Sequence, residues 1–253
     1  MQTIDLNCDM GEAFGNYSMP NDETLMNYIT SVNIACGYHA GDPAVMQQTV
    51  AMAIRKNVAI GAHPGLPDLQ GFGRREMKIS ANEAYQITLY QIGALHAFVK
   101  AAGGKLNHVK AHGALYNMAA KDAALAKAIV QAVHDFDPSL ILYALAGSQM
   151  VEAAHKISIK TASEVFADRT YQDDGSLTPR TQNNAMITNE ADSIKQVLLM
   201  VKQKQVISTS GKTINLNADT LCLHGDGDHA VDFARTISER LKKEGISIKA
   251  PSV

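Results

Sequence analysis

Short runs of β-forming residues alternate with longer helical patterns along the whole chain. Strand runs separated by helical stretches are typical of parallel sheets, because each parallel connection needs a crossover that is usually a helix. The runs are apolar over their length, which indicates that both faces of the sheet are covered. Seven runs is a barrel-like number, so we predict an α/β fold. The runs lie at residues 3–6, 31–35, 58–62, 106–110, 140–145, 157–161 and 220–223.

Capping signals mark several helix boundaries. Asp42 precedes Pro43, so a capping carboxylate stands before a proline at the first helical position, ahead of a helix over residues 44–56. Ser80 and Glu83 have the spacing of a capping box, which opens a long helix that ends near residues 103–104. Further helical patterns cover residues 122–134, 147–155, 190–204 and 230–244.

The length of the chain bears on its domain organisation. A single α/β barrel commonly has about the length of this chain, 253 residues. Neither a linker nor a low-complexity segment interrupts the sequence. Residues 205–217 read as a small hairpin that turns at Ser210 and Gly211, outside the main barrel. We therefore predict a single domain over residues 1–253 with a hairpin excursion near 205–217.

Charge and cysteine usage exclude several classes of protein. Lys and Arg number 23 and Asp and Glu number 25, a net charge of −2 without long runs of one sign, so we expect no nucleic-acid partner. Cys8, Cys36 and Cys222 form no CxxC pair, which fits a reducing cytoplasm better than a disulfide framework. The amino terminus lacks the features of a secretory signal, and no apolar run is long enough to span a bilayer. We expect a soluble cytoplasmic protein without a membrane partner.

The common nucleotide and hydrolase motifs are missing. Residues 211–213 resemble the end of a P-loop, but Val206 stands where that motif requires a glycine. The chain also lacks a GxGxxG sequence after its first strand and a GxSxG elbow. These absences argue against dinucleotide-binding and serine-hydrolase functions.

Polar and ionisable residues stand at the ends of almost all predicted strands. In a parallel α/β barrel the active site lies at the carboxyl ends of the strands. One histidine in such a position is more often a loop or capping residue than a catalyst, but four from four strands would meet at one mouth. The strand-end residues are Asn7, Asp9 and Glu12, then His39 and Asp42, then His63 and Asp68, then Lys110 and His112, then Glu164, Asp168 and Arg169, and finally His224, Asp226 and Asp228.

The other histidines and the cysteines fit structural roles. His96, His134 and His155 lie in helical stretches, and His108 precedes the end of its strand, so we interpret these four as structural or exposed. His229 begins the last helix and reads as peripheral. The three cysteines lie in apolar surroundings and are expected to be small buried core residues.

Several cations are candidates for binding an anion. Lys110 and His112 are two residues apart, so in a strand their side chains share a face and both can enter the barrel mouth. The alternative is that Lys110 closes the strand with its charge in solvent. The guanidinium groups of Arg74 and Arg75 could bind a carboxylate or phosphate through paired hydrogen bonds. The alternative is that both side chains are solvated at the surface. Weaker candidates for the same role are Arg169 and Arg180.

Seven strings of residues, in order along almost the whole chain, are similar to the LamB/YcsF family, whose members are also called 5-oxoprolinase A subunits. Two departures from the family pattern, at Ala111 and at residues 227–228, remove no titratable group. The strings are Asp5-Leu6-Asn7-Cys8-Asp9-Met10-Gly11-Glu12, Asn33-Ile34-Ala35-Cys36-Gly37-Tyr38-His39-Ala40-Gly41-Asp42-Pro43, Gly61-Ala62-His63-Pro64-Gly65, Gly71-Phe72-Gly73-Arg74-Arg75, His112-Gly113-Ala114-Leu115-Tyr116, Phe166-Ala167-Asp168-Arg169 and His224-Gly225-Asp226.

The resemblance implies an irregular seven-stranded, TIM-like (β/α) barrel similar to the glycoside hydrolase/deacetylase superfamily. It also implies ATP-dependent opening of 5-oxo-L-proline to L-glutamate, together with partner subunits B and C. ATP would be handled largely by the partners, which fits the missing P-loop. Phosphorylation of the lactam carbonyl oxygen before attack by water is a hypothesis that fits this division of labour.

In this scheme Asp9 or Glu12 is the general base for water, and the strand-end histidines are acid/base partners or metal ligands. Asp226 orients an imidazole. Lys110, with Arg74 or Arg75, holds an anionic group, and the substrate-binding set also includes Asn7, Glu164 and Arg169. A divalent metal is a further possibility, for which the candidate ligands are Asp9, His39, His63, His112 and His224.

Two other functions stay open. Asp and several His at a barrel mouth would also suit a metal-dependent amidohydrolase or carbohydrate deacetylase. A third possibility is a ligand-binding subunit without catalytic activity that activates its partners.

Overall fold

The computed structural model describes residues 2–15, 17, 19–223 and 230–252. Within these residues seven parallel strands close into a barrel, because β1 pairs with β2 on one side and with β9 on the other. The predicted seven-stranded α/β barrel is thereby confirmed. The strands are β1 (Thr3–Met10), β2 (Ser31–Ala35), β3 (Ala59–His63), β4 (Leu106–Lys110), β5 (Ile141–Leu145), β6 (Thr161–Phe166) and β9 (Thr220–Leu223). A short strand, β10 (Ser247–Ile248), pairs with the start of β1.

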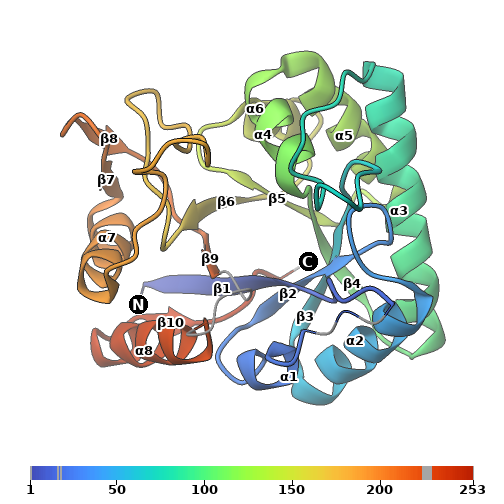
Figure 1. Cartoon of the computed structure of the whole chain (residues 1–253), viewed down its shortest axis with the longest axis horizontal. Helices are drawn as coiled ribbons and strands as arrows, with labels where there is room; N and C mark the ends of the chain where they lie inside the picture. The colour runs from blue at the N-terminus through green and yellow to red at the C-terminus, as the bar shows by residue number, and fades with distance from the viewer. Residues whose placement is uncertain (1, 16, 18, 224–229, 253) are drawn as a thin grey trace.

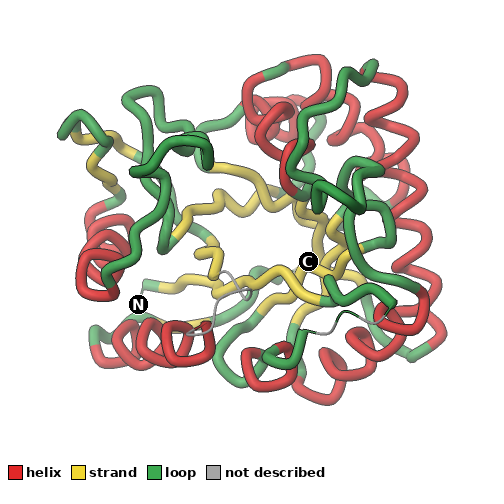
Figure 2. The backbone as a smooth tube through the Cα atoms, viewed as in Figure 1, coloured by secondary structure: helices red, strands yellow, loops and turns green. Residues whose placement is uncertain are grey.

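Helices lie around the outside of the ring of strands (Figures 1 and 2). They are α1 (Asp22–Leu25), α2 (Pro43–Lys56), α3 (Ala81–Ala101), α4 (Gly113–Lys121), α5 (Ala123–Phe136), α6 (Gln149–Lys156), α7 (Glu190–Gln203) and α8 (Ala230–Lys243). None of the helices within the described residues has the length and apolar character that crossing a bilayer requires.

The predicted capping residues do cap their helices. The Asp42 carboxylate accepts hydrogen bonds from the backbone N–H groups of Ala44 and Val45, both at 2.9 Å, with Pro43 at the first helical position. Ser80 and Glu83 form the reciprocal bonds of a capping box at the start of α3. These caps satisfy backbone donors that have no partner inside the helix.

The sixth strand and helix α4 differ from the sequence prediction, and the short elements α1 and β10 are not among the predicted ones. The pattern of apolar residues places the sixth strand at residues 157–161, but α6 runs to Lys156 and β6 begins only at Thr161. The error arises because Ser163 and Glu164, which lie inside this strand, are polar. The sequence patterns predict no helix directly after His112, but this segment forms α4, whose first residue, Gly113, has a positive φ of 55°.

The hairpin predicted near residues 205–217 is present. Strands β7 (Gln205–Ile207) and β8 (Thr213–Asn215) pair antiparallel and form a two-stranded sheet separate from the barrel. Gly211 in the turn has a φ of 90°, a conformation that glycine adopts without strain.

The inside of the barrel is polar, although the sequence predicts strands that are apolar on both faces. Ile141, Tyr143 and Ala162 form a small hydrophobic cluster that is separate from the main core. The usual barrel interior is filled by branched apolar side chains. Here several strands, β1, β2 and β4 among them, carry polar side chains at alternate positions that bond to one another, so the expectation of apolar strands does not hold for these positions.

Hydrogen bonds connect these inward side chains from strand to strand. The Asn33 amide donates to Asn7 Oδ1 and to Asp9 Oδ1, both at 2.8 Å. His108 Nε2 donates to Asn33 Oδ1 at 2.8 Å, and its ring stacks on Tyr143 with 3.9 Å between centroids. Buried polar groups are tolerated when they are bonded in this way.

The absence of a side chain at Gly61 makes room for His108. A Cβ at Gly61 would lie 2.1 Å from His108 Nε2, the atom that bonds to Asn33. We expect Gly61→Ala to destabilise the fold by about 1–3 kcal/mol or more, as overpacked cores do. Gly93→Ala, on α3 with nothing within 4 Å of its Cβ, should instead stabilise it by about 0.5–1 kcal/mol.

Urea unfolding of the two variants measures both effects. His108→Ala added to Gly61→Ala should recover part of the loss, since the clashing ring is gone. A Gly61→Ala protein as stable as the parent would show that the imidazole position is not tightly constrained.

Asp5 makes the stability of the barrel depend on pH. Its carboxylate is buried and accepts hydrogen bonds from Thr30, Ser31 and Thr220. Burial raises the pKa of Asp5 in spite of these bonds. The folded state therefore holds this proton more tightly than the unfolded state, whose aspartate has a pKa of about 3.9, and stability falls as pH rises above that value.

We expect Asp5→Asn to gain stability relative to the parent as pH rises from about 4 to 8. Urea unfolding at a series of pH values measures this difference, in which the other titrating groups cancel. A difference for Asp5→Asn that stays constant with pH would contradict the assignment.

Candidate active site

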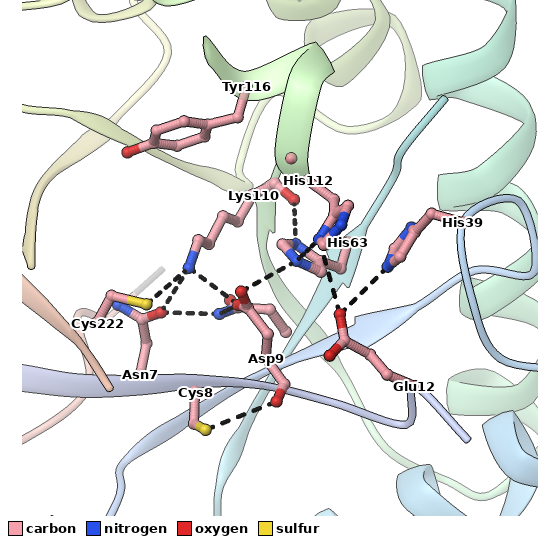
Figure 3. Close-up of polar contacts among 12 residues, drawn as sticks. Asn7, Cys8, Asp9, Glu12, His39, His63, Lys110, His112, Tyr116 and Cys222 are labelled. Atoms are coloured by element: carbon pink, nitrogen blue, oxygen red, sulfur yellow. Dashed lines mark hydrogen bonds and ion pairs between the residues drawn. The ribbon is translucent and has the colours of Figure 1, made fainter. Parts of the chain in front are cut away.

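Three histidines from consecutive β/α units meet at the mouth of the barrel (Figure 3). His39 follows β2, His63 ends β3 and His112 is the N-cap residue of α4. The rings of His39 and His112 stack with centroids 3.7 Å apart, and His63 stands edge-on to both. All three side chains are buried. The sequence prediction that these histidines converge agrees with this placement.

Backbone carbonyls determine which nitrogens of His63 and His112 carry hydrogen. His63 Nδ1 donates to Lys110 O at 2.7 Å, and His112 Nε2 donates to Phe72 O at 2.8 Å, because a carbonyl oxygen can only accept. The remaining nitrogens, His63 Nε2 and His112 Nδ1, face each other at 2.9 Å. Two neutral rings would point their lone pairs at each other, so this contact requires a cation, either a proton or a metal ion.

Two carboxylates lie beside the same nitrogens. Asp9 Oδ2 is 3.3 Å from His63 Nε2. Glu12 Oε1 is 3.3 Å from His39 Nε2 and 3.6 Å from His112 Nδ1. Their negative charge balances the cation that the facing imidazoles need.

The donor set fits a divalent metal ion. Glu12, His39, His63 and His112 each offer one ligand atom, and these atoms all lie within 4.8 Å of one another. Imidazole nitrogens with one carboxylate oxygen are ligands that zinc and neighbouring transition metals accept. The facing lone pairs of His63 and His112 are what such an ion would separate. Among the predicted ligands, Asp9 lies next to this group rather than in it.

Buried surroundings keep two of the imidazoles neutral. Burial, with the nearby charge of His63, lowers the pKa of His112 to about 3. Burial and the neighbouring imidazoles lower the pKa of His39 well below its usual value. Neutral imidazoles are the form that accepts a proton or binds a metal.

Lys110 crosses the barrel and joins several strands. The alternative that its charge lies in solvent is wrong, because the side chain is buried. Its ammonium contacts Asp9 Oδ1 at 2.9 Å, Glu164 Oε1 at 2.8 Å, Asn7 Oδ1 at 3.1 Å and Cys222 Sγ at 3.2 Å.

The ion pair keeps both partners charged. Burial by itself lowers the pKa of Lys110, but the nearby anionic groups, Asp9 first, outweigh it and raise that pKa well above its usual value. Burial likewise acts to raise the pKa of Asp9, but the charges of His63 and Lys110 hold it well below the usual range. At neutral pH Asp9 is therefore an anion and Lys110 a cation.

A cavity of about 660 Å³ opens above these groups. Asp9, Glu12, His63, Lys110 and His112 line it. Arg74, whose guanidinium lies 4.9 Å from the centre of the Phe72 ring, and Arg169 line it as well. Arg75 is not brought to the cavity, because it forms an ion pair with the buried carboxylate of Asp68 instead.

Some predicted residues lie elsewhere or are not described. Asn7 and Glu164 lie inside the barrel, where they contact Lys110 rather than the open cavity. His224 and Asp226, with Asp228 and His229, lie outside the described residues. His96, His134 and His155 are on helices away from the cavity, and the three cysteines are buried and free, as expected.

Sequence reasoning missed Tyr116 and Asn33. Tyr116 lines the cavity and donates to Glu164 Oε2 at 2.7 Å. It lies four residues after His112, so the helical spacing would have placed both on one face if α4 had been recognised. Asn33 follows Ser31 at a spacing of two in an apolar strand, a signal of inward-facing polar residues that was available in the sequence.

The family model for LamB/YcsF proteins matches residues 4–253 of this chain. The chain belongs to the LamB/YcsF family. A 5-oxoprolinase A subunit from Geobacillus kaustophilus is 59% identical over 251 residues, which cover 99% of this chain and 98% of that relative. The identification by sequence motifs is thus confirmed.

Solved structures agree with the fold of this family member. A lactam utilization protein from Thermus thermophilus matches with a TM-score of 0.92 at 42% identity, covering 98% of this chain and all of that one. A GH113 β-1,4-mannanase matches with a TM-score of 0.52 at 10% identity, covering 96% and 99% of the two chains. The second likeness concerns the barrel fold alone.

A divalent ion should stabilise the protein through the four-residue group. We expect equimolar Zn²⁺ to raise the melting temperature, because an ion that binds only the folded state adds its binding free energy to stability. Glu12→Gln and His112→Ala should reduce this rise, whereas His134→Ala, at a half-exposed position on α5, should not.

Thermal melting with and without metal, after treatment with a chelator, measures the shift, and elemental analysis of the purified protein measures the metal content. An unchanged melting temperature of the parent protein in Zn²⁺, Mn²⁺ and Ni²⁺ alike would contradict metal binding at this site. A proton shared between His63 and His112 would then be the cation that their contact requires.

Proposed function

We propose that this LamB/YcsF protein is one component of an ATP-dependent 5-oxoprolinase, which opens 5-oxo-L-proline to L-glutamate. The observation that carries the proposal is its full-length similarity to a relative named as the A subunit of that enzyme. The name of the Thermus structure, a lactam utilization protein, points to the same substrate class. The chemistry is hydrolysis of a cyclic amide, in which the carbon–nitrogen bond breaks, hydroxide adds to the carbonyl carbon and nitrogen gains a proton.

The arrangement of carboxylates and imidazoles suits this chemistry. A general base must accept a proton from water, and Asp9 and Glu12 are the carboxylates that line the cavity next to imidazoles. Of the two, Glu12 is the better candidate, because Asp9 is already paired with Lys110. His63 is the candidate acid that returns the proton to the leaving nitrogen, since its Nε2 faces His112 and Asp9.

A divalent ion, if bound, would be held by Glu12, His39, His63 and His112, and Glu12 and His63 would then serve as ligands instead of as base and acid. Such an ion would supply acidity to a bound water and polarise a carbonyl oxygen. The residues of the chain orient the water and the ring, and the closed packing around His39 and His112 limits access of bulk solvent to them.

ATP hydrolysis is proposed to occur with the help of two partner subunits, B and C. The lactam carbonyl is a poor electrophile, and transfer of the γ-phosphoryl group from ATP to its oxygen, with release of ADP, would make the carbon easier for water to attack. Cleavage of the carbon–nitrogen bond would then leave an acyl phosphate, which a second water hydrolyses to the carboxylate of glutamate and phosphate. The chain lacks a P-loop sequence, which favours a nucleotide site formed largely by the partners. The word "subunit" in the name of the relative fits an assembly.

A metal-dependent amidohydrolase is the second candidate. It is favoured by the three histidines and one glutamate with converging ligand atoms. Hydrolysis of an amide without ATP by this chain alone would support it, whereas glutamate formation that needs ATP and the partners would support 5-oxoprolinase.

Reconstitution with the two partner subunits tests the proposed activity. We expect 5-oxoproline-dependent ATP hydrolysis and glutamate release, and a loss of about 100-fold or more in glutamate release for His63→Ala and His112→Ala, because acid/base groups contribute at this scale. His134→Ala serves as the matched control, and circular dichroism verifies the fold of each variant.

Two outcomes would contradict this assignment. Near-normal turnover by both histidine variants would remove these residues from the chemistry and favour a protein that only binds ligand. Glutamate released by this chain alone without ATP would contradict the dependence on ATP.

A further inference from the structure

The cavity has one wall whose charge the proposed hydrolysis does not use. The loop between β6 and α7 contributes Arg169 and residues 177–181, which include Arg180, to the lining. We call these residues the β6 wall. Among the described residues, the carboxylates that line the cavity are Asp9, Glu12 and Glu76, which belong to β1 or to the segments after β1 and β3. Arg74, Lys110 and Lys121 line the other parts of the cavity, so the β6 wall differs in carrying cations without a carboxylate of its own in the described lining.

Arg169 is buried within this wall, and its hydrogen bonds go to neutral oxygens. Its side chain donates from Nε to Ala185 O at 3.3 Å and from Nη2 to Thr178 O at 2.5 Å. No ion pair with a carboxylate is found for Arg169 within the described part of the chain. Carbonyl dipoles compensate a buried cation less completely than a directly paired carboxylate does, and an anion in the cavity would lower the remaining cost.

The surroundings of Arg169 leave its charge under-compensated. Burial, followed by the positive charge of Arg180, lowers the pKa of Arg169 to about 10, although Asp168 acts in the opposite direction. Two guanidinium groups close enough to repel each other and facing one cavity are typical of sites that bind phosphate or carboxylate groups.

Lys110 cannot take this role, because its charge is already matched. It is held between Asp9 and Glu164, both within 2.9 Å, inside the barrel. A second negative group brought by a ligand therefore needs another cation. The cavity, at about 660 Å³, is of the size that holds drug-sized ligands, and a single lactam ring with one carboxylate fills only part of it.

We infer that the β6 wall binds a tetrahedral phosphoryl group. The identity of the ligand rests on the proposed function, in which the phosphoryl group belongs either to the activated lactam or to the end of a nucleotide. Arg169 supplies a planar fork for two phosphoryl oxygens, and Arg180 at the exposed rim adds a second cation. The lactam ring then lies between this wall and the imidazoles, within reach of Glu12 and His63.

Calorimetric titration of the purified full chain with inorganic phosphate, at constant ionic strength set with chloride, tests this site. We expect saturable binding by the parent protein. Arg180→Gln should weaken it by about tenfold, the loss of one charge-assisted contact, and Arg169→Lys should weaken it as well, because lysine keeps the charge but loses the fork. Arg55→Gln, on the exposed side of α2, is the matched control and should bind like the parent.

If Arg169→Lys disturbs the loop, its melting temperature falls. The Arg180→Gln variant then carries the test, because Arg180 is exposed and its substitution should not disturb the fold. Absence of saturable phosphate binding by the parent, or equal affinity for the parent and Arg180→Gln, would overturn the inference. Parallel titrations with ATP and adenosine show whether the bound phosphoryl group belongs to a nucleotide or to the activated lactam. ATP that binds far more tightly than phosphate and is displaced by adenosine assigns the group to a nucleotide, and ATP that binds no more tightly assigns it to the activated lactam.

The outcome is separable from that of the proposed function. Phosphate binding that depends on Arg180, in a chain whose reconstituted complex forms no glutamate, would leave the phosphoryl site standing and remove 5-oxoprolinase. Glutamate formation by a complex in which this chain shows no phosphate binding would support 5-oxoprolinase and remove the phosphoryl site.

Discussion

The ammonium of Lys110 is the interaction on which the centre of this protein depends. It contacts side chains from β1, β6 and β9 and starts from the end of β4, so one charge ties together strands on different sides of the barrel. Removing two carboxylates and an ammonium from water is expensive, and it is offset only when the geometry and the remaining hydrogen bonds are good. The amides of Asn7 and Asn33 provide those bonds. The carboxylate of Asp9 is thereby held next to the imidazole of His63.

The imidazole cluster follows from this arrangement. The backbone carbonyl of Lys110 accepts from His63 Nδ1, so the same residue that fixes Asp9 through its side chain fixes the tautomer of His63 through its main chain. His63 then presents its free nitrogen to His112 and Asp9. The charge of Lys110 is matched by Asp9 and Glu164, whereas the hydrogen bonds of Arg169 in the β6 wall go to carbonyl oxygens.

Much of this could be predicted from the sequence, because barrel topology converts strand ends into neighbours. His39, His63, His112, Asp9 and Glu12 form a predicted group on that ground and do come together. Arg74 and Arg75 could not be told apart, since the direction of each side chain depends on the turn around Gly73, whose φ is 63°. Glu164 is expected after its strand but lies within it, because a polar barrel interior hides a strand from any search for apolar runs. The facing lone pairs of two imidazoles depend on ring orientation, which spacing in the sequence does not encode.

The polar interior described above also restricts how this barrel can vary among its relatives. Several inward side chains bond to more than one neighbour; Asn33, for example, accepts from His108 and donates to Asn7 and Asp9. A single substitution leaves at least one buried group without its partner, which selection removes. Residues such as Gly61 and His108, one of which makes room for the other, are therefore expected to change together or not at all, and the interior should evolve in blocks rather than residue by residue.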